Sequence, residues 1–256
     1  MKSRAYKLSL ISLGIILMVW VFFNSSELVS PLELPPHSAI KLFARWILTV
    51  IPMTGALLLL HKPKFILEST GLNGNILKGF GFALLCTLPL YAGFPFFGKI
   101  NTDITLETIL YRVVIAAFFE EVAFRGFMFG QLFRYGRIGF FWAALFPALL
   151  FGSAHIYQGH DLVSSLSVFA ITFLGALYFS WIYVEWDFNV WMPIGLHFFM
   201  NLSWQMFIIE GNEVAAGGLI SNILRIISIV LAIIITILHK RKSKKRIFDY
   251  PVWSIR

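Results

Sequence analysis

Three short segments of the sequence place ionisable or amide side chains inside apolar stretches. They read EEVAFR at residues 120–125, FGSAH at 151–155 and HFFMN at 197–201. A charged side chain at the centre of a bilayer costs about 2.5–3.5 kcal/mol on insertion scales, so residues placed there are functional candidates. A carboxylate can act as a general base, and imidazole and amide groups can donate hydrogen bonds to a developing negative charge. The three segments therefore predict acid–base chemistry inside a membrane.

Helical spacing separates the two glutamates of the first segment. Glu121 and Arg125 are four residues apart, so they share one helix face and we expect them to form an ion pair. Glu120 is rotated by about 100° from Glu121 and needs another partner. We therefore expect Glu120 to act on a reacting group, and Glu121 with Arg125 to be a structural clamp.

The other two segments repeat this spacing of four residues. Phe151 precedes His155 by about one helical turn and should pack beside its imidazole, and His197 shares a face with Asn201. We expect His155 to approach Glu120, and His197 and Asn201 to converge as two neutral hydrogen-bond donors. Each polar residue taken alone is explained equally well as a contact between helices.

The rest of the chain supplies the membrane spans that must position these residues. Of 256 residues, 58% are hydrophobic and 13% are charged, against about 25% charged in soluble proteins. Stretches long enough to cross about 30 Å of hydrocarbon recur along the chain. We expect an all-α polytopic membrane protein with about eight transmembrane helices that enclose an intramembrane catalytic cavity. The predicted spans are at about 8–23, 42–60, 77–97, 107–126, 139–157, 162–184, 188–209 and 219–238.

The basic residues indicate how the spans are oriented. The net charge of +8 is concentrated in MKSRAYK at the start and HKRKSKKR near the end, and Lys and Arg beside spans mark the cytoplasmic side. We therefore expect both termini in the cytoplasm and no nucleic acid as a partner. Glu185 and Asp187 lie on this same side and oppose the pattern. The first span could instead be a signal peptide, although no typical cleavage site follows it.

The loops are too short to form a separate soluble domain. We therefore expect one integral membrane domain over residues 1–256, with N-terminal spans at 8–97, a motif-bearing core at about 107–205 and a basic cytoplasmic tail at 239–256. Cys86 is the single cysteine of the sequence, which excludes an intramolecular disulfide and a thiolate metal cluster.

Taken in order, the three motifs resemble those of the CPBP family. This family contains the CAAX proteases and bacteriocin-processing enzymes, among them the Ras-converting CAAX endopeptidase and many bacterial Abi proteins. The resemblance covers about residues 107–205. The family pattern EExxxR, FxxxH and HxxxN corresponds here to Glu120-Glu121-xxx-Arg125, Phe151-xxx-His155 and His197-xxx-Asn201.

The resemblance implies an intramembrane glutamic endopeptidase of a bacterial plasma membrane that needs no cofactor. The first glutamate and the first histidine would activate water, and the second histidine and the asparagine would stabilise the tetrahedral oxyanion. The substrate would be a membrane-associated, CAAX-like protein or peptide cut near its C-terminus, and by the same analogy the cavity would open toward the cytoplasm or the inner leaflet. The implied catalytic residues are Glu120, His155, His197 and Asn201, supported by Glu121, Arg125 and Phe151.

Two other interpretations stay open. Two histidines and a glutamate form a known catalytic zinc set, which His155, His197 and Glu120 could supply, although the sequence lacks HExxH. The same polar residues could instead pack a membrane scaffold, an immunity protein or a transporter subunit, although two related halves are not visible. Loss of a peptidase activity in a folded Glu120→Gln variant would exclude the scaffold.

Overall fold

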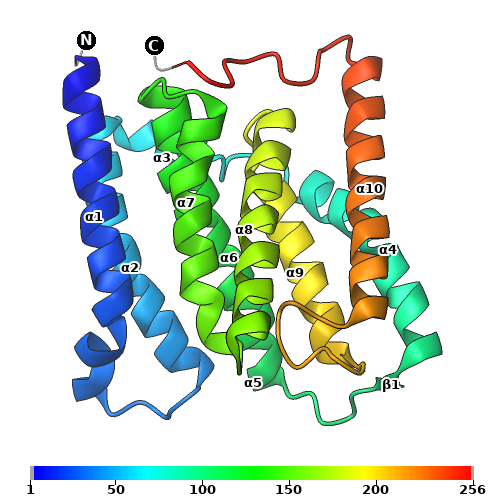
Figure 1. The fold of residues 1–256 in the computed structure, drawn as a ribbon. Coiled ribbons are helices and arrows are strands. Elements are labelled where there is room, and N and C mark those ends of the chain that lie inside the picture. The colour runs from blue at the N-terminus through cyan, green and yellow to red at the C-terminus, as the bar shows by residue number, and fades with distance from the viewer. Residues whose placement is uncertain (1–2, 255–256) are drawn as a thin grey trace.

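A computed structural model describes residues 3–254, and helices make up most of this range (Figure 1). A two-stranded antiparallel ribbon joins β1 (Lys99–Ile100) to β2 (Phe207–Ile208). Lys2 and the last two residues of the predicted tail 239–256 lie outside the described range. The helices outside the first motif are α1 (Arg4–Val29), α2 (Ala39–Leu60), α3 (Ile66–Thr70), α4 (Ile76–Phe97), α7 (Phe140–His155), α8 (Leu162–Glu185), α9 (Trp191–Met206) and α10 (Leu219–Lys242), with single turns η1 (Ser30–Leu32), η2 (Pro63–Phe65) and η6 (Ile156–Gln158).

The first motif lies on a nearly continuous helical stretch at residues 106–135, here termed the motif segment. Its α-helical parts are α5 (Leu106–Ile109) and α6 (Ala116–Glu121). The wider π-helical turns are η3 (Leu110–Ile115), η4 (Val122–Phe129) and η5 (Gln131–Tyr135). Such turns are rare and are found frequently at functional sites. The sequence predicts an ordinary α-helix here, so the π-helical turns correct that expectation.

Six helices of the described range are long and apolar enough to cross a membrane, which confirms an all-α polytopic membrane protein. Each of the eight predicted spans coincides with a helical segment. Two of the eight predicted spans are not among these six helices, and these two spans carry the first and third motifs. The motif segment is divided between α- and π-helical turns, and α9 has 16 residues, a length of about 24 Å. The first and third motifs therefore lie on spans that are irregular or short.

Successive long helices alternate in direction, so their loops gather at two ends of the molecule (Figure 1). The terminal end contains the first and last described residues and the loops at 61–75, 136–139 and 186–190. The distal end contains the loops at 30–38, 98–105, 156–161 and 207–218. These two names are used below.

Residues 243–254, the C-terminal strap, cross the terminal end from α10 to α7 (Figure 1). The carbonyl of Pro251 accepts a hydrogen bond from the backbone N–H of Phe140 at 2.9 Å, and that of Val252 from Phe141 at 3.0 Å. α7 begins after Gly139 without a side-chain cap. The strap therefore satisfies helix N–H groups that have no partner within the helix itself.

Glycines allow α9 to pack closely against α4. A Cβ built on Gly79 would lie 2.5 Å from the carbonyl oxygen of Trp191, and a Cβ on Gly195 would lie 2.8 Å from Cβ of Ala83. A larger residue at either position would push the two helices apart. Because His197 follows Gly195 by two residues, this crossing helps to position the third motif.

Candidate active site

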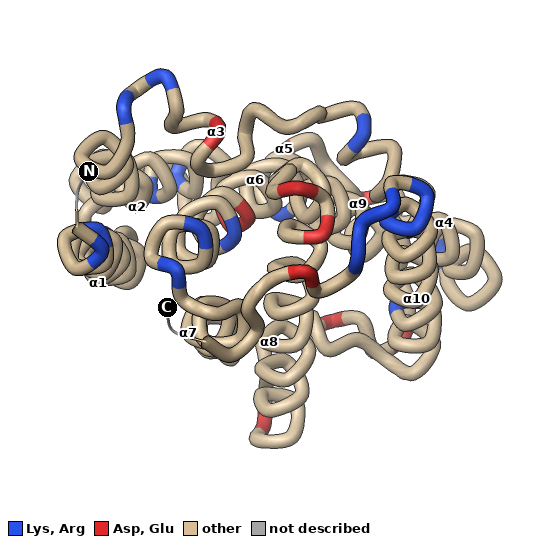
Figure 2. The backbone as a smooth tube through the Cα atoms, turned by 90° about the horizontal axis from the view of Figure 1, so that it is seen from above, with Lys and Arg blue, Asp and Glu red and all other residues tan. Residues whose placement is uncertain are grey.

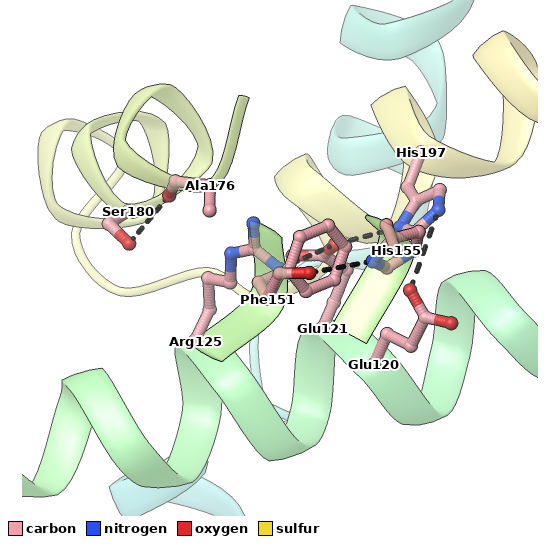
Figure 3. A network of polar contacts seen from close by, with 8 residues as sticks. All are labelled: Glu120, Glu121, Arg125, Phe151, His155, Ala176, Ser180 and His197. Carbon is pink, nitrogen blue, oxygen red and sulfur yellow. Dashed lines mark hydrogen bonds and ion pairs between the residues drawn. The ribbon is translucent and has the colours of Figure 1, made fainter. Parts of the chain in front are cut away.

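The three motifs, which are far apart in the sequence, meet where α6, α7 and α9 come together (Figure 3). Oε1 of Glu121 accepts a hydrogen bond from Nη1 of Arg125 at 3.0 Å and lies 2.8 Å from Nδ1 of His197. The ion pair expected from the spacing of four residues is therefore present. It is extended by His197 from another helix, a contact that local spacing does not predict.

Arg125 and Glu121 are enclosed by the protein, with 1% and 0% of their surfaces exposed. The guanidinium carbon lies 4.9 Å from the ring centre of Phe151 and 5.3 Å from that of Phe179. A buried cation needs such compensation, and here it comes from a carboxylate and two aromatic faces. The guanidinium is thus compensated internally, through one of the two oxygens of Glu121 and two aromatic rings.

Glu120 is directed at the other ring nitrogen of His197 (Figure 3). Its Oε2 lies 3.9 Å from Nε2, and the side chains of Glu120 and His197 are 18% and 12% exposed. No hydrogen-bond partner of Oε2 is found among the residues that the structure describes. We expected His155 as the partner of Glu120, whereas the recorded ion-pair contact is with His197. Of the two adjacent glutamates, Glu120 is the one that keeps acceptor capacity at a partly exposed position.

His155 lies close to this cluster and is held by its own helix. Its Nδ1 lies 2.7 Å from the carbonyl oxygen of Phe151, and the two rings are 4.4 Å apart, as their spacing predicts. Because a carbonyl oxygen can only accept, Nδ1 carries the proton, and Nε2 of a neutral His155 has a free lone pair. The ring of Phe151 also lies 6.5 Å from that of His197. One aromatic side chain therefore neighbours both imidazoles.

Asn201 bonds the backbone of the motif segment. Its amide nitrogen donates to the carbonyl of Arg112 at 2.9 Å, within the π-helical η3. We expected Asn201 and His197 to converge as two neutral donors. In the structure, each already uses one donor elsewhere, Asn201 on Arg112 and His197 on Glu121. The second amide N–H of Asn201 and Nε2 of His197 are the groups left for a substrate.

A zinc site would require Glu120, His155 and His197 to share one metal ion. Over residues 3–254, His, Cys, Asp and Glu side chains form no group of three suited to hold a metal ion. The Nδ1 atoms of both histidines already contact a carbonyl or carboxylate oxygen.

Residues 103–203 match a family model described as "Type II CAAX prenyl endopeptidase Rce1-like". The matched range contains all three motifs and agrees with the range of about 107–205 over which the sequence resembles CAAX proteases, so the predicted family is confirmed for this region. The match supports a protease of the membrane. A comparison with curated proteins gives no match.

Proposed function

Because residues 103–203 are of the Rce1-like type II CAAX prenyl endopeptidase family, we propose that the protein is an intramembrane endopeptidase. It hydrolyses a peptide bond near the C-terminus of a membrane-associated protein or peptide. One observation carries the proposal. A carboxylate oxygen of Glu120 without a hydrogen-bond partner lies beside His197 in a partly exposed part of a membrane protein.

Glu120 is the proposed general base, assisted by His155. A carboxylate with free acceptor capacity can hold a water molecule, and the unprotonated Nε2 of His155 supplies a second acceptor for that water. The water oxygen attacks the peptide carbonyl carbon while its proton passes to Glu120. General acid–base catalysis of this kind contributes about 10²–10⁴-fold to a rate.

His197 and Asn201 are the proposed stabilisers of the oxyanion. The ionised groups of Glu120, Glu121 and Arg125 sum to one negative charge, which a positively charged His197 balances. In that form, Nε2 of His197 carries a proton that it can donate to the tetrahedral oxyanion, together with the second amide N–H of Asn201. Donors fixed in advance in a site of low dielectric constant are worth more than the same donors in water.

The tetrahedral intermediate collapses when its C–N bond breaks. The leaving amine takes the proton from Glu120, and the new carboxyl end retains the oxygen of the water. Glu120 is returned to its ionised form, and an acyl-enzyme is not formed at any step.

The decisive experiment compares the C-termini of proteins in membranes that contain the wild type or Glu120→Gln. The matched control is Glu210→Gln, the same substitution at an exposed glutamate of the distal end. We expect a set of new C-termini that disappears in Glu120→Gln and persists in Glu210→Gln. If Glu120→Gln, His155→Ala and His197→Ala all leave the C-termini unchanged while folding normally, the protein is a scaffold and the proposal fails.

A further inference from the structure

The helices that carry the motifs become less buried toward the distal end. On the motif segment, every residue from 121 to 132 is buried, whereas Leu106 and Glu107 are exposed. On α9, residues 192–196 are buried and residues 197–202 are partly exposed. The same change in exposure on helices that run in opposite directions indicates that the site is more enclosed toward the terminal end than toward the distal end.

The closed side faces the terminal end. Phe127, Met128 and Phe129 follow Arg125 on the motif segment, and each is 0% exposed. The guanidinium of Arg125 is itself covered by aromatic rings. A peptide approaching from the terminal end would therefore have to displace the most tightly packed part of the protein.

The open side is bordered by distal loops. η6 follows His155 directly, and its Tyr157 is 81% exposed. The side-chain oxygen of the neighbouring Gln158 accepts a hydrogen bond from the backbone N–H of Ala215 in the loop 207–218. The partly exposed face of the site is thus continuous with the distal end.

Lys and Arg are concentrated at the terminal end (Figure 2), and acidic residues predominate in the distal loops. This distribution assigns the terminal end to the cytoplasm. The cations of the terminal end are Arg4, Lys7, Lys62, Lys64, Lys78, Arg134, Arg137, Lys240, Arg241, Lys242, Lys244, Lys245 and Arg246. The acidic residues of the distal end are Glu27, Glu33, Asp103, Glu107, Asp161, Glu210 and Glu213.

Four acidic residues lie at the terminal end, namely Glu68, Glu185, Asp187 and Asp249, and lysines near the end of the chain pair with two of them. Oε2 of Glu185 lies 3.1 Å from Nζ of Lys240, and Oδ1 of Asp187 lies 2.8 Å from Nζ of Lys245. Their charges are therefore paired, and the excess of positive charge at the terminal end remains.

From the exposure of the site and the distribution of charge, we infer that the site opens on the extracytoplasmic side of the membrane. Its substrate is then a membrane-anchored polypeptide whose scissile bond is presented from that side. This inference rests on the proposed function, and it reverses the cytoplasmic opening expected from CAAX-type tails. Those tails would reach the closed side of the site.

Labelling of single cysteines tests the orientation without any need for activity. Spheroplasts that contain Tyr157→Cys or Ser243→Cys are treated with a membrane-impermeant maleimide, and native Cys86, 0% exposed, provides the unreactive background. We expect Tyr157→Cys to be labelled at least about tenfold more than Ser243→Cys, and both to be labelled after permeabilisation. Glu213→Cys is a second distal probe should Tyr157→Cys not fold. Preferential labelling of Ser243→Cys in intact spheroplasts would overturn the inference.

The location of Glu120-dependent C-termini then tests the substrate class. We expect these termini to lie on extracytoplasmic segments of membrane-anchored proteins, and termini on cytoplasmic segments would overturn the inference. A complete absence of Glu120-dependent termini overturns the proposed function and the substrate class with it. External labelling of Tyr157→Cys would still support the extracytoplasmic opening, so the two failures are distinguishable.

Discussion

Two carboxylate clusters of the molecule differ in what their oxygens contact. At the terminal end, Glu185 is 1% exposed. Its Oε2 lies 3.1 Å from Nζ of Lys240, and its Oε1 accepts hydrogen bonds from the backbone N–H of Phe248 at 3.0 Å and the hydroxyl of Tyr250 at 3.1 Å. At the site, the contact of Glu120 is longer, with Oε2 at 3.9 Å from Nε2 of His197. The comparison shows that donor groups approach the buried Glu185 more closely than they approach the partly exposed Glu120.

The largest difference between the clusters should appear in activity. Glu120→Gln keeps the size of the side chain and removes the base, so we expect cleavage to fall by about 10²–10⁴-fold with little change in thermal unfolding. Glu185→Gln should do the reverse and lower the unfolding temperature while retaining cleavage. Both are measured as cleavage rates and melting curves of purified protein in detergent. Equal loss of cleavage in the two variants would contradict the comparison.

The internal ion pair of the site should dominate its stability. Arg125→Met leaves Glu121 buried without its cation, and removing one partner of a buried pair costs about 3–5 kcal/mol. The double variant Glu121→Gln/Arg125→Met should recover most of that stability and remain impaired in cleavage, because His197 loses its carboxylate partner. Thermal unfolding and cleavage are measured for the wild type, Arg125→Met and the double variant. A double variant less stable than Arg125→Met would show that the unpaired charge of Glu121 does not cause the loss of stability.

The cluster at the terminal end should respond more weakly to loss of its cation. Lys240→Met removes the partner of Glu185, but the donors from Phe248 and Tyr250 remain, so we expect a loss of about 1–3 kcal/mol. Lys242→Met, on the exposed end of the same helix, is the matched control. Thermal unfolding measures the loss, and limited proteolysis should cut the strap faster in Lys240→Met alone.

A still smaller change in stability is expected from the Tyr250 hydroxyl of the strap, and alkaline pH tests it. Burial, and next the charge of Glu185, raise the pKa of Tyr250. The neutral phenol is the form that donates to Glu185, so its contribution is fully present below the ordinary tyrosine pKa of about 10. It is lost as the pH rises through the raised value of the folded protein. We expect Tyr250→Phe to lose about 0.5–1.5 kcal/mol near neutral pH and to lose less further stability at alkaline pH than the wild type, as measured by thermal unfolding.

Removal of metal should have the smallest effect, namely none. If Glu120 and His155 activate water directly, cleavage should be unchanged after treatment with a chelator and verified depletion of metal. Loss of cleavage that zinc restores would favour the zinc alternative and would mean that the oxygens of Glu120 are filled by a metal during catalysis.

Contacts within one helix could be predicted from the sequence, and contacts between helices could not. The spacing of four residues was enough to pair Glu121 with Arg125 and to place Phe151 beside His155. It carried no information on which histidine Glu120 would face, and the contact is with His197. The hydrogen bond from Asn201 to the Arg112 carbonyl could not be predicted either, because it depends on how α9 packs against a π-helical turn.

The spans were predictable because hydrophobicity reports burial in lipid over long stretches. The strap was not, since residues 243–254 form no regular element and have no periodicity to detect. Basic residues near the end suggested only a cytoplasmic tail. Glu185 and Asp187, which oppose the charge pattern, were the sequence signal that acidic groups at the terminal end needed cations.

The strap has a consequence for how the protein is made. The carbonyls of Pro251 and Val252 bind the start of α7, while His155 lies at the other end of that helix. Those two residues follow α7 by three further helices in the sequence, so α7 is synthesised before its first turn has these partners. A chain shortened before residue 251 would leave the first turn of α7 without them, at the end of the helix opposite His155.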